Sequence, residues 1–160
     1  MYKNKKSNQS VIILTSLIII SYVLGFNLNE DSAGGGKIDY TEHEWGTIQL
    51  FINNNLNIAL NSVLYESSRT PLFYIINKFI PFNNDSENLR LFWFIFSIII
   101  PFLFYYTLKL IISEKLNKTH IALFAVVILI SPYFRTNAYW PSSENLQIFF
   151  VILSLFFYFF

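Results

Sequence analysis

Residues 89–112 read LRLFWFIFSIIIPFLFYYTLKLII, and this stretch decides the class of fold. No charged side chain lies between Arg90 and Lys109, and a helix needs about 20 mostly apolar residues to cross a bilayer. Pro101 lies inside the run, where we expect a kink. The whole chain is 54% hydrophobic and 13% charged, whereas soluble domains carry roughly 25% charged residues. The sequence therefore predicts an all-α membrane protein.

Three more apolar runs extend this pattern to a polytopic helix bundle, at residues 11–26, 120–134 and 146–160. A secretory signal peptide is the alternative for the first run. However, that run is longer than the usual apolar region of about 7–15 residues, and no A-x-A-like cleavage site follows. We therefore favour an uncleaved membrane helix. The last run is still apolar at Phe160, so we expect residues 1–160 to be the N-terminal part of one longer transmembrane domain.

Positive charge marks the segments that we expect on the cytoplasmic side. Lysines are concentrated in the N-terminal tail and after the second run: Lys3, Lys5, Lys6, Lys109, Lys115 and Lys118. By the positive-inside rule, both segments face the cytoplasm from the cell (inner) membrane. Residues 27–88 then form an outer loop, and residues 133–143 lie on the same side. The net charge of +1 gives no indication of nucleic-acid binding.

The outer loop contains two stretches with helical spacing of apolar residues. Residues 47–64 place isoleucine, leucine and phenylalanine at roughly helical intervals, and residues 71–80 begin with Pro71 at a favourable first-turn position. Amphipathic helices of this kind lie in the plane of the membrane interface. We therefore predict an outer loop that carries two interfacial helices.

The densest polar cluster, residues 30–40, reads EDSAGGGKIDY and follows the first membrane helix directly. Its three glycines allow sharp turns and a close approach to a ligand. A phosphate-binding P-loop is excluded, because Ile38 follows Lys37 where that motif needs serine or threonine. Two interpretations stay open, a flexible exit loop and a ligand-binding loop. The chain has no cysteine, which excludes thiolate chemistry.

The next residues invite a metal-site interpretation. His43-Glu44 begins like the zinc-protease motif HExxH, but Thr47 stands in place of the second histidine. If the segment is helical, Asp39, Glu42 and His43 share one face. That face either holds a divalent metal ion, the one cofactor that the sequence leaves open, or is a solvated acidic surface. Solvated polar faces are the commoner case.

Two arginines flank the apolar segments on the predicted outer side. Arg69 lies between the two amphipathic stretches, and Arg135 follows the third apolar run. Arginines at membrane edges often extend along the bilayer surface to reach lipid headgroups. The planar guanidinium also suits phosphate binding. Both interpretations remain open for each arginine.

The order of these features resembles the N-terminal part of GT-C glycosyltransferases, the polytopic enzymes that use polyprenyl-phosphate-linked sugars. The similarity is to the protein-mannosyltransferase-like and aminoarabinose-transferase-like group. The matching pieces are residues 31–39, residues 69–74 (RTPLFY) and residues 131–135 (SPYFR). The resemblance rests on the order of these short motifs and covers nearly the whole chain.

The resemblance implies a glycosyltransferase with inversion, transferring sugar to a lipid, glycan or protein acceptor outside the membrane. Asp39, followed by an aromatic residue, is the expected catalytic base, and Asp31 is the second choice. The expected substrate-binding residues are Arg69, Arg135, Lys37 and Tyr74. We expect residues 1–160 alone to be inactive, because the rest of the cavity is missing. The alternative is a non-catalytic membrane scaffold or a transporter fragment.

Overall fold

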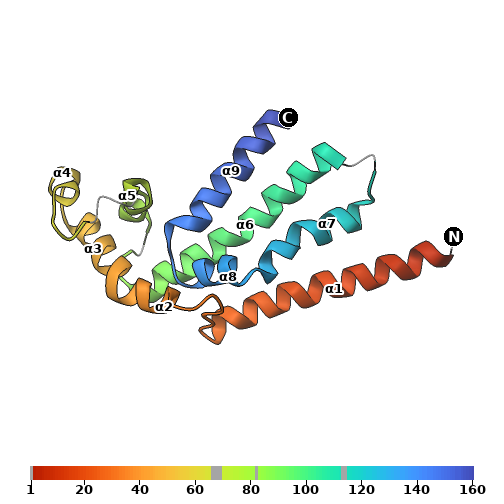
Figure 1. The fold of residues 1–160 in the computed structure, drawn as a ribbon, viewed down its shortest axis with the longest axis horizontal. Coiled ribbons are helices and arrows are strands. Elements are labelled where there is room, and N and C mark those ends of the chain that lie inside the picture. Colours follow the sequence, from red (N-terminus) through yellow and green to blue (C-terminus); the bar gives the residue numbers. More distant parts are fainter. Residues whose placement is uncertain (1, 66–69, 82, 113–114) are drawn as a thin grey trace.

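The structure is a computed structural model that describes residues 2–65, 70–81, 83–112 and 115–160. Within these ranges the chain is helical and contains no strand, as the sequence predicts. These helices lie side by side in a bundle (Figure 1): α1 (Tyr2–Asn27), α6 (Ser86–Ile112), α7 (Lys118–Val126) and α9 (Ser143–Phe159). Beyond one end of the bundle lie three short helices: α3 (Trp45–Asn53), α4 (Leu56–Leu60) and α5 (Pro71–Phe79).

Two of the described helices are long and apolar enough to cross a membrane, Asn8–Asn27 and Ser86–Ile112. Their outward side chains are exposed in the isolated chain, 61% for Ile13 and 64% for Phe102. Exposed apolar surfaces of this extent mark contacts with lipid or protein. The length and composition of these helices indicate a membrane protein, and the helices cover the first two predicted apolar segments.

The third predicted membrane segment, residues 120–134, is not one straight helix. Its predicted C-terminal boundary at residue 134 is wrong. Helix α7 continues as a 3-10 turn, η2 (Val127–Ile130), and the chain then bends by 69° into α8 (Pro132–Tyr139). Pro132 disfavours helical backbone at Ser131. The Ser131 hydroxyl instead accepts a hydrogen bond from the Phe134 amide at 3.4 Å and starts a new helix.

The predicted interfacial helix at residues 47–64 is also wrong in its extent, because it divides into α3 and α4. Asn54 has an extended backbone, and its side chain donates to the Leu50 carbonyl at 2.9 Å. Lys78 of α5 then donates to three carbonyls at this helix end, those of Phe51, Ile52 and Asn54, at 2.7–3.2 Å. A helix leaves its last carbonyls unpaired, and Lys78 satisfies them. The second predicted helix, from Pro71, is present as α5.

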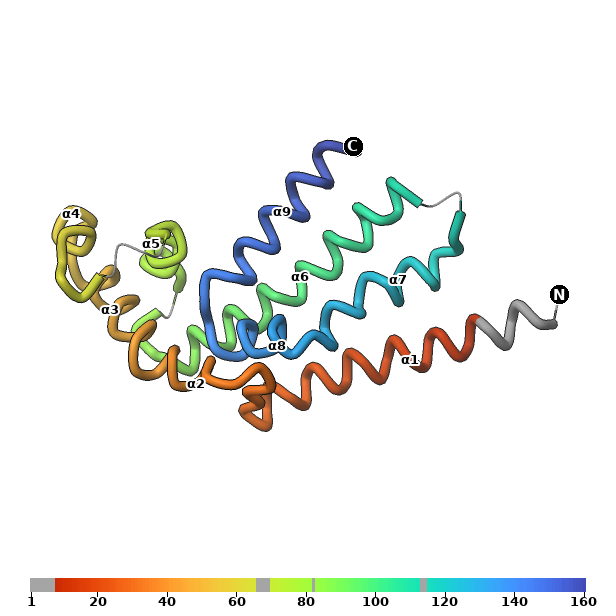
Figure 2. Tube along the Cα trace, viewed as in Figure 1, coloured from red at the N-terminus to blue at the C-terminus, as the bar shows by residue number. Residues whose placement is uncertain are grey.

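Between the bundle and α3, the chain crosses the bundle end through α2 (Gly36–Ile38) and a π-helical turn, η1 (Asp39–Glu44) (Figure 2). Aromatic rings pack where α1, α6 and α8 meet. Phe26 stacks on Phe94 with centroids 4.2 Å apart, and Tyr139 donates to the Tyr22 carbonyl at 2.6 Å. These contacts fix the end of the bundle on which the polar residues gather.

Candidate functional site

Arg90, at the start of α6, organises the polar end of the bundle. Its side chain is buried, with Nε donating to the Tyr139 carbonyl (2.9 Å) and Nη1 donating to both carboxylate oxygens of Glu87 (2.9 and 2.7 Å). Nη2 donates to Asn29 Oδ1 at 2.9 Å, and the guanidinium lies 3.7 Å from the ring centre of Trp140. We call these five residues the arginine clamp. It joins three separate parts of the chain through hydrogen bonds and a cation–π contact.

A second arginine, Arg135 of α8, binds the loop after α1. Its guanidinium forms an ion pair with Glu30 and donates to the hydroxyl (3.1 Å) and carbonyl (3.0 Å) of Ser21. Gly25 makes room for this pair, because a Cβ atom there would collide with both the carboxylate and the guanidinium. Arg135 is thus held inside the protein by Glu30, and its predicted contact with a lipid phosphate stays a prediction.

The glycine-containing loop after α1 is tied to α8. The Ser32 hydroxyl donates to the Pro132 carbonyl (3.3 Å), and the Ala33 amide donates to the Thr136 hydroxyl (3.0 Å). Gly35 has φ of 88°, a left-handed conformation that glycine adopts without strain. The loop therefore places α2 and η1 against the start of α9. Residues 27–44 and 131–143, predicted to share one side of the membrane, meet at this end of the bundle.

Asp31 has a local structural contact in this loop. Its carboxylate accepts hydrogen bonds from the backbone amides of Gly36 (3.2 Å) and Lys37 (3.3 Å). These amides lie at the start of α2, where a helix lacks internal acceptors. A carboxylate that stabilises a helix start is less free to accept a substrate proton. The geometry therefore favours Asp39 over Asp31 as the candidate base.

A polar cavity of about 150 Å³ lies between η1 and the turn from α8 to α9. We call it the corner pocket. It is lined by residues of α2, η1 and the α8–α9 turn: Gly36, Asp39, Tyr40, Glu44, Asn137, Trp140, Pro141, Ser142, Ser143 and Glu144. Asp39, the predicted base, is exposed and faces this cavity. Lys37 lies over the ring of Trp140 with Nζ 5.5 Å from its centre. The pocket thus combines a carboxylate, an aromatic wall and a nearby cation.

Two of the residues that line the corner pocket have buried polar atoms without a hydrogen-bond partner. These atoms are Asn137 Nδ2 and Glu144 Oε2, a donor and an acceptor. The other end of the Asn137 amide accepts from the Ser142 hydroxyl at 3.0 Å. An unpaired buried polar group costs about 1–3 kcal/mol, so folded proteins rarely contain one without a reason. The two atoms mark this turn as a place where hydrogen bonds are available.

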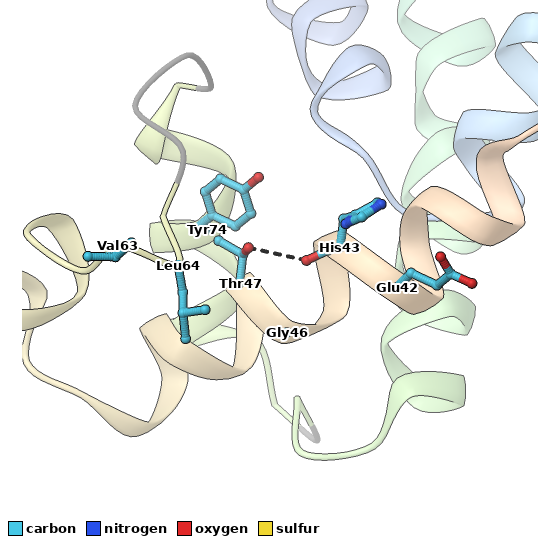
Figure 3. Close-up of a pocket in the computed structure, with 7 residues that line it drawn as sticks. All are labelled: Glu42, His43, Gly46, Thr47, Val63, Leu64 and Tyr74. Atoms are coloured by element: carbon cyan, nitrogen blue, oxygen red, sulfur yellow. Dashed lines mark hydrogen bonds between the residues drawn. The ribbon is translucent and has the colours of Figure 1, made fainter.

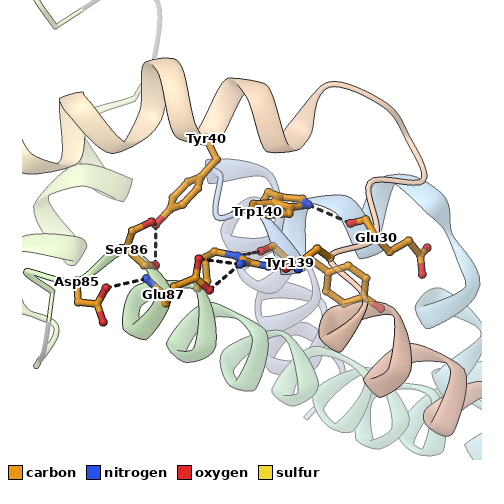
Figure 4. Close-up of polar contacts among 9 residues, drawn as sticks. Glu30, Tyr40, Asp85, Ser86, Glu87, Tyr139 and Trp140 are labelled. Atoms are coloured by element: carbon orange, nitrogen blue, oxygen red, sulfur yellow. Dashed lines mark hydrogen bonds and ion pairs between the residues drawn. The ribbon is translucent and has the colours of Figure 1, made fainter.

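Tyr40 connects the corner pocket to α6. Its hydroxyl donates to the Ser86 carbonyl at 3.1 Å, and Trp140 donates from Nε1 to the Glu30 carbonyl at 3.0 Å (Figure 4). Burial raises the pKa of the Tyr40 phenol to about 12, although the hydrogen bond to Ser86 opposes this shift. The phenol is therefore uncharged at neutral pH, and it acts as a fixed hydrogen-bond donor in the pocket wall.

A larger cavity of about 520 Å³ lies on the other side of η1 (Figure 3). It is lined by residues of η1, α3, α5 and the segment after α4: Glu42, His43, Gly46, Thr47, Val63, Leu64 and Tyr74. Tyr74, a predicted substrate-binding residue, is buried and donates to Glu44 at 2.8 Å. This cavity is larger than the corner pocket, but Asp39, the predicted base, does not line it. We therefore place the candidate site in the corner pocket.

The structure does not support the metal-site alternative for Asp39, Glu42 and His43. In the part of the chain that the structure describes, no group of three histidine, cysteine, aspartate or glutamate side chains is placed to hold a metal ion. Asp39 lines the corner pocket, whereas Glu42 and His43 line the larger cavity. The segment is a π-helical turn, whose i→i+5 hydrogen bonds differ from those of the α-helix that the prediction assumed. Arg69 lies outside the described residues.

Sequence reasoning missed three residues that the structure brings to this end of the bundle. Arg90 was taken only as the edge of an apolar run, and Asn137 and Glu144 were not considered. A charged residue in the first turn of a long apolar helix is itself a signal, because arginine is rarely buried unless paired. Nothing in the local sequence distinguishes Asn137 and Glu144 from ordinary polar residues of a turn.

An apolar groove of about 410 Å³ runs along the bundle between α1, α6 and α7. Aliphatic and aromatic side chains line it, including Ile19, Tyr22, Phe102 and Tyr105. Tyr22 accepts a hydrogen bond at its carbonyl from Tyr139. One hydrogen bond therefore joins a residue that lines the groove to the last residue of α8, which directly precedes Trp140 of the corner pocket.

Comparisons with protein-family models, with curated proteins and with solved structures gave no match. The functional argument therefore rests on the sequence pattern and on the geometry of the corner pocket.

Proposed function

We propose that the chain is part of a membrane glycosyltransferase that transfers a sugar from a polyprenyl-phosphate donor to a lipid, glycan or protein acceptor. In this proposal the membrane is crossed several times, the N-terminus faces the cytoplasm, and residues 27–88 lie outside the cell (inner) membrane. The lysine distribution supports this orientation, and the two long apolar helices supply at least two crossings.

One observation carries the proposal. Asp39 lines a polar cavity at the end of two candidate membrane-spanning helices, and Trp140 of the same cavity lies beneath the ammonium group of Lys37. A membrane enzyme that joins a lipid-linked sugar to an acceptor needs a carboxylate and a cation at this depth. Asp39 belongs to a π-helical turn, a conformation found frequently at functional sites.

The proposed chemistry is a single displacement at the anomeric carbon. The Asp39 carboxylate accepts the proton of the acceptor hydroxyl as the acceptor oxygen bonds to that carbon. The bond from the anomeric carbon to the phosphate oxygen breaks, and polyprenyl phosphate leaves with the electron pair from the opposite face. The configuration at the anomeric carbon is inverted.

The leaving phosphate gains negative charge, which a preplaced cation stabilises. Lys37 is the best-placed candidate among the described residues, because its side chain is exposed beside the pocket. Arg135 takes this role only if the phosphate replaces Glu30 as its partner. Arg69, which the family resemblance also implies, lies outside the described residues.

The apolar groove between α1, α6 and α7 supports a lipid-linked donor. The groove offers apolar side chains along the bundle, and these match the hydrocarbon chain of such a donor. Tyr22, which lines the groove, accepts a hydrogen bond from Tyr139, the residue before Trp140 of the corner pocket. A donor with a sugar at one end and a hydrocarbon chain at the other suits this arrangement.

The test is a transfer assay on the intact gene product in membranes, with a panel of radiolabelled polyprenyl-phosphate sugars. Asp39→Asn should lower transfer at least about 100-fold, the lower end of what general-base catalysis contributes. Glu42→Gln is the matched control, because it removes a carboxylate from the same turn but lines the other cavity. That variant should retain transfer.

Transfer that persists in Asp39→Asn would assign the base to another residue, with Asp31→Asn as the next variant. Absence of transfer from every donor, with a protein shown to be folded, would favour a scaffold or transporter. A second pair of variants, Lys37→Met and Arg135→Met, separates the two candidate cations. Loss of transfer in the first with retention of Tm supports phosphate contact by Lys37.

A further inference from the structure

We propose that the corner pocket selects a neutral monosaccharide and rejects an anionic sugar such as a uronate. This inference rests on the proposed function, because it concerns the sugar of the same lipid-linked donor. Its two specificity-determining residues are Asn137 and Glu144.

The size of the pocket limits its occupant. The cavity has a volume of about 150 Å³ and is partly open, so it can take one sugar ring while the rest of the donor stays outside. Trp140, Ser142 and Ser143 line the cavity, and the Arg90 guanidinium and the Lys37 ammonium already lie over the ring of Trp140.

The available hydrogen bonds match sugar hydroxyls. A hydroxyl group both donates and accepts, and the pocket offers a donor at Asn137 Nδ2 and an acceptor at Glu144 Oε2. Both atoms are buried within the pocket wall. Rotation about the terminal bond of an amide or carboxylate is soft, so each can turn toward a ring that enters the cavity. Adjacent hydroxyls on one ring would then satisfy both atoms.

The carboxylates that line the corner pocket disfavour a sugar that carries a negative charge. Three carboxylates line the cavity, those of Asp39, Glu44 and Glu144, and no lysine or arginine is among the lining residues. Lys37 lies on the ring of Trp140, at the side proposed for the phosphate. A uronate would bring its carboxylate close to like charges in a partly enclosed site, where repulsion is stronger than in water. Specificity often depends on such repulsive contacts.

The experiment measures binding, independently of transfer. The intact gene product in nanodiscs is incubated with radiolabelled short-chain polyprenyl-phosphate glucose or polyprenyl-phosphate glucuronate, with empty nanodiscs as background. The parent protein should bind the glucose compound about tenfold more tightly, equivalent to one strong polar interaction. Glu144→Gln should remove most of this difference by improving glucuronate binding. Asn137→Ala should weaken glucose binding by about tenfold.

Glu42→Gln is the charge-matched control and should leave the ratio unchanged, because Glu42 lines the other cavity. Equal binding of the two compounds by the parent, no binding of either, or an unchanged ratio in Glu144→Gln would each overturn the inference. Transfer measured on the same samples separates the two proposals. Selective binding without transfer would contradict the proposed glycosyltransferase activity but support the preference for a neutral sugar. Equal transfer from both donors would support the activity but contradict the preference.

Discussion

The arginine clamp and the corner pocket share Trp140, but they differ in whether their buried polar side-chain atoms have hydrogen-bond partners. In the clamp, Arg90 uses its donors on Glu87, Asn29 and a backbone carbonyl. In the pocket, Asn137 and Glu144 each keep one buried atom without a partner. The Glu87 side chain of the clamp is 70% exposed, whereas Asn137 and Glu144 are half-buried, so pairing does not simply follow burial.

We interpret this difference as one between residues that stabilise the fold and residues that are available to bind a ligand. A fully paired buried charge adds rigidity, and removing its partner leaves desolvated groups behind. An unpaired group weakens the folded state and is retained only when another advantage offsets the cost. We therefore expect substitutions in the clamp to affect stability, and substitutions in the pocket to affect ligand binding.

The largest effect is expected for Arg90→Met. This change leaves the Tyr139 carbonyl and Asn29 without their donor, removes the cation–π contact with Trp140, and should lower the free energy of unfolding by on the order of 3 kcal/mol. Chemical unfolding in detergent micelles measures it. Lys109→Met on the exposed side of the same helix is the control and should change stability by less than about 0.5 kcal/mol. Equal effects of the two variants would show that the clamp is not structural.

Tyr40 lies between the two regions and gives a pH-dependent test. Its folded pKa is about 12, against about 10 in the unfolded chain. Below pH ~10 both states hold the proton, and the stabilisation is complete. Between these values the unfolded chain loses the proton first, so the free energy of unfolding falls as pH rises, by on the order of 2 kcal/mol in total.

Tyr40→Phe should therefore unfold at a temperature that changes less between pH 10.5 and pH 11.5, which lie about one half-unit inside this window at each end. Thermal unfolding in detergent at several pH values measures the slope. Tyr133→Phe, which removes a hydroxyl from an exposed residue, is the matched control and should follow the parent. A steep slope retained in Tyr40→Phe would mean that other groups control alkaline unfolding.

The smallest effect on stability is expected for Asn137→Ala, although the same variant should lose sugar binding. The substitution removes one hydrogen bond with Ser142 but also removes an unpaired buried donor, and these terms nearly cancel. We expect a change below about 1 kcal/mol in the free energy of unfolding. Chemical unfolding beside Arg90→Met checks it, and a loss as large as that of Arg90→Met would assign Asn137 to the structural network.

The sequence predicted the helices whose signal is local. The apolar length of residues 89–112 needs no tertiary contact to identify a candidate membrane helix, and α6 covers it. Pro71 likewise marked the start of α5. The predictions failed where another element decides the boundary. Lys78 stabilises the end of α3 from outside that helix, and the periodicity of residues 47–64 contains no sign of it.

The candidate site was only partly predictable for the same reason. Asp39 and Lys37 were selected from the family resemblance. In the structure Asp39 lines the corner pocket, and Lys37 lies over Trp140 beside it. Asn137 and Glu144 come from a distant segment, so their role depends on contacts between loops that the sequence does not show. The roles of Asp39 and Lys37 remain predictions until transfer is measured.

The sequence by itself indicated a membrane environment for this protein, because apolar length and the distribution of charge are properties of single segments. Only the tertiary structure decided which polar residues are paired. Arg90 and Arg135 are alike as sequence, at the edges of apolar runs, and both are held by carboxylates through contacts that span three and 105 positions. Hydrogen-bond satisfaction is a property of the assembled chain, and it is what separates the clamp from the pocket.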